Sequence, residues 1–274
     1  MSQTNRFRKP LGAELYTVRQ ILPHKADITI KRIEDIGYSE VECGRHDLAM
    51  LAPILKKYGM TVPSVHLETG LITGQRAEWK LPARLTWENA LDEAKSHGAA
   101  FAVIPYVHPH ERGNLDDWRA LCEKLNKAGE TARAAGLTLC YHNHAFELAG
   151  EPGKRPIDIL IEHTDADLVG LEIDVFWLSV AGQDPAEFVE HHAARVRLIH
   201  LKDKVKSMPV LFDEAKAKAS DFKEVGNGSL DFPSILRAAD KAGVAHYFVE
   251  QDHTTHDPVD SLQVSYQHLR ALTL

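Results

Sequence analysis

Histidine and carboxylate side chains gather at the ends of several short hydrophobic segments. The polar ends are Tyr-His-Asn-His (141–144) with Glu147 close behind, Glu-Ile-Asp (172–174), His-Leu-Lys-Asp (200–203), Glu-Gln-Asp-His (250–253) and, earlier in the chain, His66 and Glu68. A divalent cation must replace its water ligands with fixed oxygen and nitrogen donors, and these residues supply both. One such end is commonly structural, but four in succession would bury several charges, each needing a partner or a metal. The pattern predicts a divalent metal site.

Eight short segments rich in β-forming residues alternate along the chain with longer, charged segments of helical spacing. This alternation is typical of a parallel sheet covered by helices, and eight is the number of strands in a (β/α)8 barrel. Glycines precede several of the segments and are expected to end the helices between them. The predicted strands are 11–17, 39–44, 61–67, 101–106, 137–142, 169–174, 196–201 and 245–250.

A barrel of this kind needs about 250 residues, so the 274 residues predict one α/β domain, a single (β/α)8 TIM barrel over residues 1–274. Its active site is expected where strands end and the following loops begin, which is where the polar residues gather. Two connections, 68–82 and 203–230, are longer than a barrel requires and predict lids or binding segments.

The composition narrows the choice of partners. A formal net charge of −7 argues against a nucleic-acid-binding protein, which would need a basic surface. The three cysteines form neither a disulfide framework nor a zinc ribbon pattern, which fits a reducing cytoplasm. We find no secretory leader and no apolar stretch of membrane-spanning length, so we expect a cytoplasmic protein without a membrane partner. The sequence leaves the oligomeric state open, a homo-oligomer included.

Three of the strand ends resemble a known family, the xylose-isomerase-like barrels of sugar isomerases, epimerases and dehydratases, which also include endonuclease IV. They are Glu-Ile-Asp-Val-Phe (172–176), Leu-Ile-His-Leu-Lys-Asp (198–203) and Phe-Val-Glu-Gln-Asp (248–252). The resemblance covers most of the chain. It implies one divalent ion (Mn, Co, Zn or Mg) with Asp174, His200 and Glu250 among its ligands.

The chain departs from that family at two positions. Family members commonly have a glutamate at the end of the fifth strand, where counting from Gly136 places His142. The fourth ligand is therefore either His142, as a neutral imidazole, or Glu147, and the sequence leaves both open. The second departure is Trp177, where related epimerases often have a histidine. We expect Trp177 to form an apolar wall or a stacking surface for a sugar ring.

The resemblance implies proton abstraction beside a carbonyl group that the metal polarises, with a small sugar or polyol as substrate. Glu250 and, if it reaches, Glu147 are the expected proton carriers, and His144 and Lys202 the further catalytic candidates. His66, Trp177 and His253 are expected to contact substrate. The leading prediction is an isomerase or epimerase acting on a ketose or keto-sugar derivative. The alternatives are a lyase of the inosose dehydratase type and a non-catalytic carbohydrate-binding barrel. Gly226-Asn227-Gly228 is a weak phosphate-binding signal.

Overall fold

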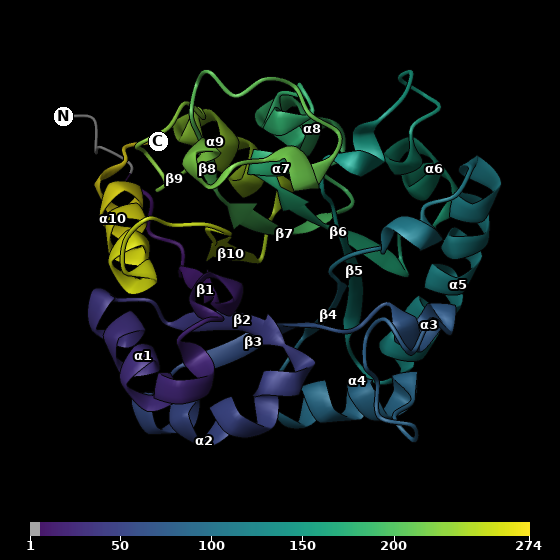
Figure 1. The fold of residues 1–274 in the computed structure, drawn as a ribbon, viewed down its shortest axis with the longest axis horizontal. Helices are drawn as coiled ribbons and strands as arrows, with labels where there is room; N and C mark the ends of the chain where they lie inside the picture. Colours follow the sequence, from purple (N-terminus) through teal and green to yellow (C-terminus); the bar gives the residue numbers. More distant parts are fainter. Residues whose placement is uncertain (1–5) are drawn as a thin grey trace.

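The structure, a computed structural model, describes residues 6–274, and its centre is a closed barrel of eight parallel strands (Figure 1). Around the barrel the strands follow the order β1-β10-β7-β6-β5-β4-β3-β2. Pairing of β1 with β10 closes the barrel, with Gly12 opposite Phe248. The barrel strands are β1 (Gly12–Glu14), β2 (Glu40–Gly44), β3 (Thr61–His66), β4 (Phe101–Ile104), β5 (Thr138–His142), β6 (Val169–Asp174), β7 (Val196–Leu201) and β10 (His246–Val249).

Helices surround the barrel, and the last of them, α10, packs against α1 so that the two ends of the fold meet (Figure 1). Each longer helix buries one face against the strands, and sequence caps fix where it begins. In α5, for example, the Asn114 side chain accepts hydrogen bonds from the first helical N–H groups. The helices are α1 (Leu22–Ile36), α2 (Leu48–Tyr58), α3 (Gly70–Thr73), α4 (Trp87–Ser96), α5 (Leu115–Ala134), α6 (Pro156–His163), α7 (Val175–Val180), α8 (Pro185–His191), α9 (Phe232–Ala242) and α10 (Pro258–Ala271).

The predicted (β/α)8 TIM barrel is confirmed, and all eight predicted segments contain a barrel strand. The first prediction, 11–17, was too long, because the strand ends at Glu14 and a short 3-10 helix, Leu15–Val18, follows. The carboxylate of Glu14 accepts a hydrogen bond from the N–H of Tyr16 and so caps that turn. The glycines expected to end helices do adopt positive φ, as at Gly37 (115°) and Gly243 (74°).

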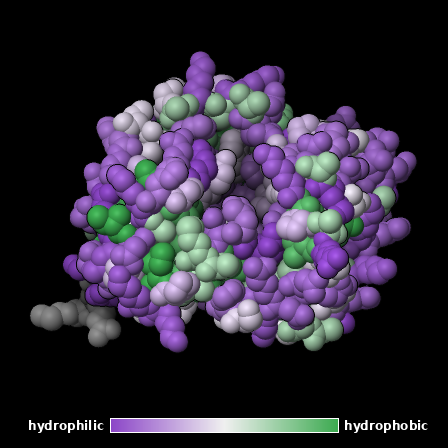
Figure 2. Space-filling model, turned by 60° about the horizontal axis from the view of Figure 1, so that its bottom comes forward, coloured by the Kyte–Doolittle hydropathy of each residue, from purple (hydrophilic) through white to green (hydrophobic). Residues whose placement is uncertain are grey.

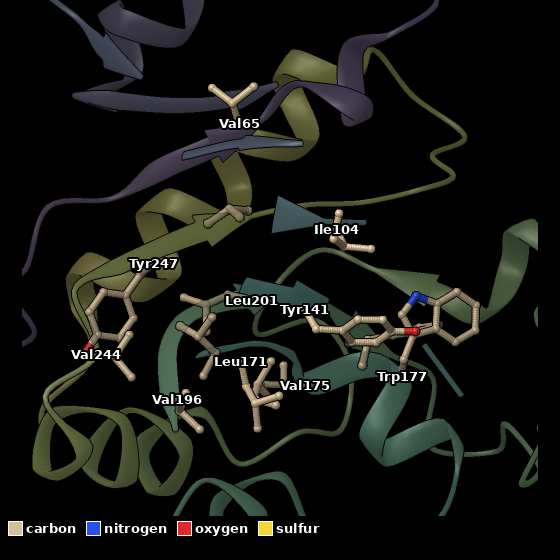
Figure 3. Packing of buried hydrophobic residues seen from close by; sticks show 14 of the residues in the cluster. Val65, Ile104, Tyr141, Leu171, Val175, Trp177, Val196, Leu201, Val244 and Tyr247 are labelled. Atoms are coloured by element: carbon tan, nitrogen blue, oxygen red, sulfur yellow. The ribbon is translucent and has the colours of Figure 1, made fainter. Parts of the chain in front are cut away.

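Two layers of buried side chains result from the alternation of residues along each strand. Outward-facing residues pack under the helices, as Tyr141 and Leu171 do in Figure 3. Inward-facing residues fill the barrel, where Val103, Cys140, Leu198 and Phe248 form a small apolar cluster. Two positions after Cys140, Leu198 and Phe248 the inward-facing residues are polar: His142, His200 and Glu250.

The two long connections both carry structure of their own. The first, 68–82, contains α3, and the second, 203–230, contains an antiparallel pair of two-residue strands, β8 (Asp203–Lys204) and β9 (Phe222–Lys223). Within residues 6–274, none of the helices has the length and hydrophobicity needed to cross a membrane. Hydrophilic residues cover most of the face in Figure 2, and the hydrophobic patches there are small. All three cysteines are free and buried.

Candidate active site

The candidate site lies directly above the apolar cluster inside the barrel. His142, His200 and Glu250 each follow a residue of that cluster by two positions, so their side chains also point inward. Strand register sets their neighbours, with Asp174 opposite His200 and His142 opposite Glu172. The mouth of the barrel thus collects imidazoles and carboxylates from three neighbouring strands, β5, β6 and β7, and from the loop after β10.

Four atoms of these side chains have the arrangement of a metal-binding set. His142 Nε2 lies 3.8 Å from Asp174 Oδ2, and His200 Nδ1 lies 2.9 Å from Glu250 Oε2. Ligand atoms of His142, Asp174 and His200 come within 4.8 Å of one another. Asp174 Oδ2 is buried and accepts no hydrogen bond from any residue of the described chain. A buried acceptor beside two imidazole nitrogens fits a divalent cation, which would satisfy it.

Lys202 places its positive charge against the carboxyl groups of Asp174, Glu250 and Asp252. Its ammonium lies 2.9 Å from Asp174 Oδ2, 2.8 Å from Glu250 Oε2 and 3.1 Å from Asp252. The contact with Asp174 meets the distance of an ion pair but lacks the angle of a hydrogen bond, which is why that oxygen remains unpartnered.

The pKa values of this group follow from burial and from the charges of its neighbours. Burial alone would raise the pKa of Glu250, but the charges and hydrogen bonds of Lys202 and His200 hold it well below its usual range. For Asp252, burial dominates and raises the pKa to about 8; Lys202 opposes this rise and Glu250 adds to it. The two carboxyl groups therefore differ at neutral pH, one ionised and the other protonated.

Two carboxylates that the sequence analysis did not assign lie behind the candidate ligands. Glu172 Oε2 is 3.1 Å from His142 Nδ1, and Glu42 Oε2 is 2.5 Å from His200 Nε2. Both carboxylates are fully buried. Glu172 stands within one of the motifs used for the prediction, and Glu42 lies two residues before the end of the second predicted strand. A polar residue near a strand end was the available signal for both.

Glu147, one of the two proposed fourth ligands, lies on a different side of β5. Its carboxylate accepts hydrogen bonds from the Tyr141 hydroxyl (2.9 Å) and the His144 N–H (2.8 Å). Tyr141 faces outward into the layer under the helices, so it holds Glu147 away from the inward-facing His142. Burial raises the pKa of Glu147 to about 8. The geometry therefore brings His142, and not Glu147, into the group with Asp174 and His200.

Aromatic rings border the site near the end of β5. The ring of His144 lies 5.0 Å from that of His142 and 5.5 Å from that of Trp177. Burial lowers the pKa of His144 well below its usual value, so its ring is neutral, and its Nδ1 finds no partner in the described chain. Trp177 is buried, as an apolar wall would be. His253 is exposed, with its ring 5.3 Å from Phe222.

The Gly226-Asn227-Gly228 turn is filled by a side chain of the protein itself. The carboxylate of Asp203 accepts hydrogen bonds from four backbone N–H groups of this segment. The donors are Gly226 (3.0 Å), Gly228 (2.9 Å), Ser229 (2.9 Å) and Leu230 (3.1 Å). A Cβ atom added at Gly228 would lie 2.3 Å from Asp203 Oδ1, so glycine is needed for this approach. These N–H groups form the kind of concave site that could bind an anion, and Asp203 already occupies it.

Comparison with known proteins agrees with this architecture. The family model described as a xylose isomerase-like TIM barrel matches residues 30–272. An inosose dehydratase of Geobacillus thermodenitrificans is 32% identical over 165 residues, which are 57% of this chain and 54% of that protein. The chain thus spans about half the length of such curated relatives.

Two solved structures illustrate the shared fold. A sugar phosphate isomerase/epimerase of Parabacteroides distasonis aligns over 99% of this chain and 96% of its own, with a TM-score of 0.76 and 24% identity. The IOLI protein, solved with a zinc atom, aligns over 97% and 99% with a TM-score of 0.72 and 13% identity. At these identities the likeness concerns the fold alone.

Proposed function

The chain belongs to the family of xylose isomerase-like TIM barrels, and on that premise we propose that it removes a proton from the carbon beside a carbonyl group of a sugar or polyol. The observation that carries the proposal is the group that His142, Asp174 and His200 form at the barrel mouth, with ligand atoms within 4.8 Å of one another. Glu250 joins this group through its contact with His200 at 2.9 Å. A divalent ion held by these four residues would act there as a Lewis acid on the carbonyl. Two imidazoles and two carboxylates suit Zn, Co or Mn better than Mg, which prefers oxygen donors.

Three side chains of the site can handle the charges and protons of this step. Glu250 is ionised and is the proposed base that takes the carbon-bound proton. The Lys202 ammonium, 2.8 Å from Glu250, can donate a hydrogen bond to the oxygen on which negative charge develops. Asp252 is protonated near neutral pH and is the proposed acid that returns a proton. The ionised and the protonated carboxyl groups thus stand side by side, as acid–base chemistry requires.

We favour loss of water as the outcome. After proton removal, a hydroxyl group on the next carbon can leave as water if an acid protonates it, and Asp252 is placed to supply that proton. The inosose dehydratase relatives support this lyase reading, since their names describe such an elimination. The isomerase or epimerase outcome stays as the second candidate because the neutral His144, with its unpartnered Nδ1, offers another group that could return a proton to carbon.

The proposed substrate carries no phosphate group. The anion site formed by the N–H groups of residues 226–230 is filled by Asp203. Two cations at the site are already ion-paired. Lys202 is paired with Asp174 and Glu250, and Arg112, which packs on Phe146 beside His144, is paired with Glu214 at 2.6 Å. A phosphate bound at either cation would have to displace a carboxylate from an existing ion pair.

The deciding experiment incubates metal-loaded protein with inososes and keto-sugars in deuterated water, in parallel with phosphorylated counterparts, and follows products by NMR. We expect deuterium at the carbon beside the carbonyl of a neutral substrate, together with a dehydrated product. Turnover of the phosphorylated compounds instead would contradict the neutral-substrate proposal. Binding of a sugar without any exchange would indicate a carbohydrate-binding barrel, and turnover that requires a nicotinamide or phosphoryl donor would contradict the proposed mechanism.

A further inference from the structure

Glu42, His66 and Glu172 form a continuous chain of contacts against the two candidate ligand histidines, and we call these three residues the rear belt. Glu42 and Glu172 are fully buried, and His66 is 16% exposed through its side chain. They come from β2, β3 and β6, so the belt exists only because the barrel is closed. The proposed chemistry assigns no step to any of the three.

Each end of the rear belt meets one candidate ligand. Glu172 Oε2 faces His142 Nδ1 at 3.1 Å, and Glu42 Oε2 faces His200 Nε2 at 2.5 Å. An ionised carboxylate only accepts hydrogen bonds, so each facing ring nitrogen must carry a hydrogen. In a neutral imidazole the other nitrogen then carries the lone pair. For His142 that nitrogen is Nε2, beside Asp174. For His200 it is Nδ1, which also faces the ionised Glu250 at 2.9 Å and would exchange its proton for the metal ion.

His66 joins the two ends. Its Nε2 lies 3.3 Å from Glu42 Oε2 and 3.3 Å from Glu172 Oε2, so one ring nitrogen contacts both carboxylates. The same Glu172 oxygen also lies 3.4 Å from His200 Nε2. A displacement of either carboxylate would therefore change the contacts of both ligand histidines, because the two histidines share these contacts.

We infer that the rear belt positions the metal site: Glu172 and Glu42 fix the tautomer and ring orientation of His142 and His200, and His66 couples the two. This inference rests on the proposed function, since it takes those histidines as metal ligands. Carboxylates behind ligand histidines orient the ring and raise the basicity of the nitrogen that binds the metal. Histidine at position 142 is consistent with this arrangement, because Glu172 lies opposite it in the barrel and can accept a hydrogen bond from its Nδ1–H at 3.1 Å.

The test measures cobalt binding to the full chain by competition with a chelator and records the visible spectrum of the bound Co(II), which reports its ligand geometry. Glu42→Gln and Glu172→Gln keep the side-chain shape and an acceptor oxygen but lose the charge. We expect each to weaken cobalt binding about 10- to 100-fold and to shift the cobalt spectrum. The double variant should depart by about threefold or more from the product of the single effects, because His66 couples them.

Glu40→Gln is the matched control. Glu40 also lies on β2 and also contacts a histidine, His246, at 2.8 Å, but it does so away from the candidate ligands. Its substitution should leave cobalt affinity and spectrum unchanged. Circular dichroism identifies any variant that fails to fold. If one of the two single variants, Glu42→Gln or Glu172→Gln, fails, the cobalt affinity and spectrum of the other decide the test.

Wild-type affinity and spectrum in both carboxylate variants would overturn the inference while leaving the proposed function standing. Strictly multiplicative effects in the double variant would overturn the coupling through His66. A wild-type chain that binds no cobalt, zinc or manganese would overturn the proposed metal site and the inference with it, and is recognised before any variant is made.

Discussion

The barrel interior contains two neighbouring layers with opposite character. Val103, Cys140, Leu198 and Phe248 form an apolar layer and are fully buried. Two residues further along three of the same strands, toward their carboxyl ends, stand His142, His200 and Glu250. Both layers face inward because side chains alternate along a strand. The lower layer gains free energy from apolar burial, whereas the upper one buries charges whose desolvation is costly unless each finds a partner. The apolar layer, which stabilises the fold, and the charged layer, which would carry the chemistry, are thus only two residues apart along a strand.

The largest expected effect in this comparison comes from Glu250 in the charged layer. Glu250→Gln keeps the shape but removes the basic oxygen, so we expect a rate loss of at least about a thousandfold, or about 4 kcal/mol of transition-state stabilisation. The measurement is kcat/KM on the substrate found by the deuterium-exchange screen. Glu190→Gln, at an exposed position on α8 outside the barrel, is the control and should retain full activity. Comparable losses in both variants would show that Glu250 has no special role.

A truncation in the apolar layer should lower the stability of the fold and leave metal binding nearly unchanged. Leu198→Ala leaves a cavity in a fully buried site, so we expect the free energy of unfolding to fall by about 2–5 kcal/mol. Urea unfolding measures the change, and Val264→Ala, a truncation at an exposed position on α10, should alter it by less than about 0.5 kcal/mol. Metal affinity of the folded variant should stay within about threefold of wild type. A large loss of metal affinity would mean that the two layers are not separable.

The next prediction concerns the fourth ligand of the charged layer. His142→Ala should weaken metal binding by at least about a hundredfold, equivalent to about 2.7 kcal/mol, because it removes one donor and the shortest of the three histidine contacts of Glu172. Glu147→Gln should leave the affinity unchanged, since Glu147 is bound to Tyr141 and the backbone of His144. Isothermal titration with Zn or Co compares the two. The reverse result would make Glu147 the ligand.

The sequence predicted those parts of the site that depend on position along a strand. That Asp174, His200 and Glu250 lie close together could be predicted because polar residues at strand ends meet in any parallel barrel, and the family resemblance implied that these three are ligands. Glu42 could not be placed against His200, since that contact joins β2 to β7 across the interior and depends on how the barrel closes. Glu147 is only five residues from His142, and the sequence left both open as the fourth ligand. The outward-facing Tyr141 decides otherwise, through a hydrogen bond that no pattern of residue types reveals.

The last prediction is a pH dependence of stability that comes from Glu147, in the layer under the helices. Burial raises its pKa to about 8 in the folded chain, against about 4.3 in an unfolded one. Between these values the folded state binds more protons than the unfolded state. The stabilisation is therefore complete below about pH 4 and is lost as the pH rises toward and through 8, at up to about 1.4 kcal/mol per pH unit.

Glutamine at position 147 resembles the protonated carboxyl and does not titrate, so Glu147→Gln should remove this slope while the other groups of the protein continue to titrate. The quantity to follow is the difference in the free energy of unfolding between wild type and variant, measured in urea from pH 6 to 9. It should move in favour of the variant as the pH rises. Glu151→Gln, at an exposed position, should show no such trend. A difference that stays constant across this range would mean that Glu147 is already ionised at pH 6, with Tyr141 and the His144 N–H outweighing burial.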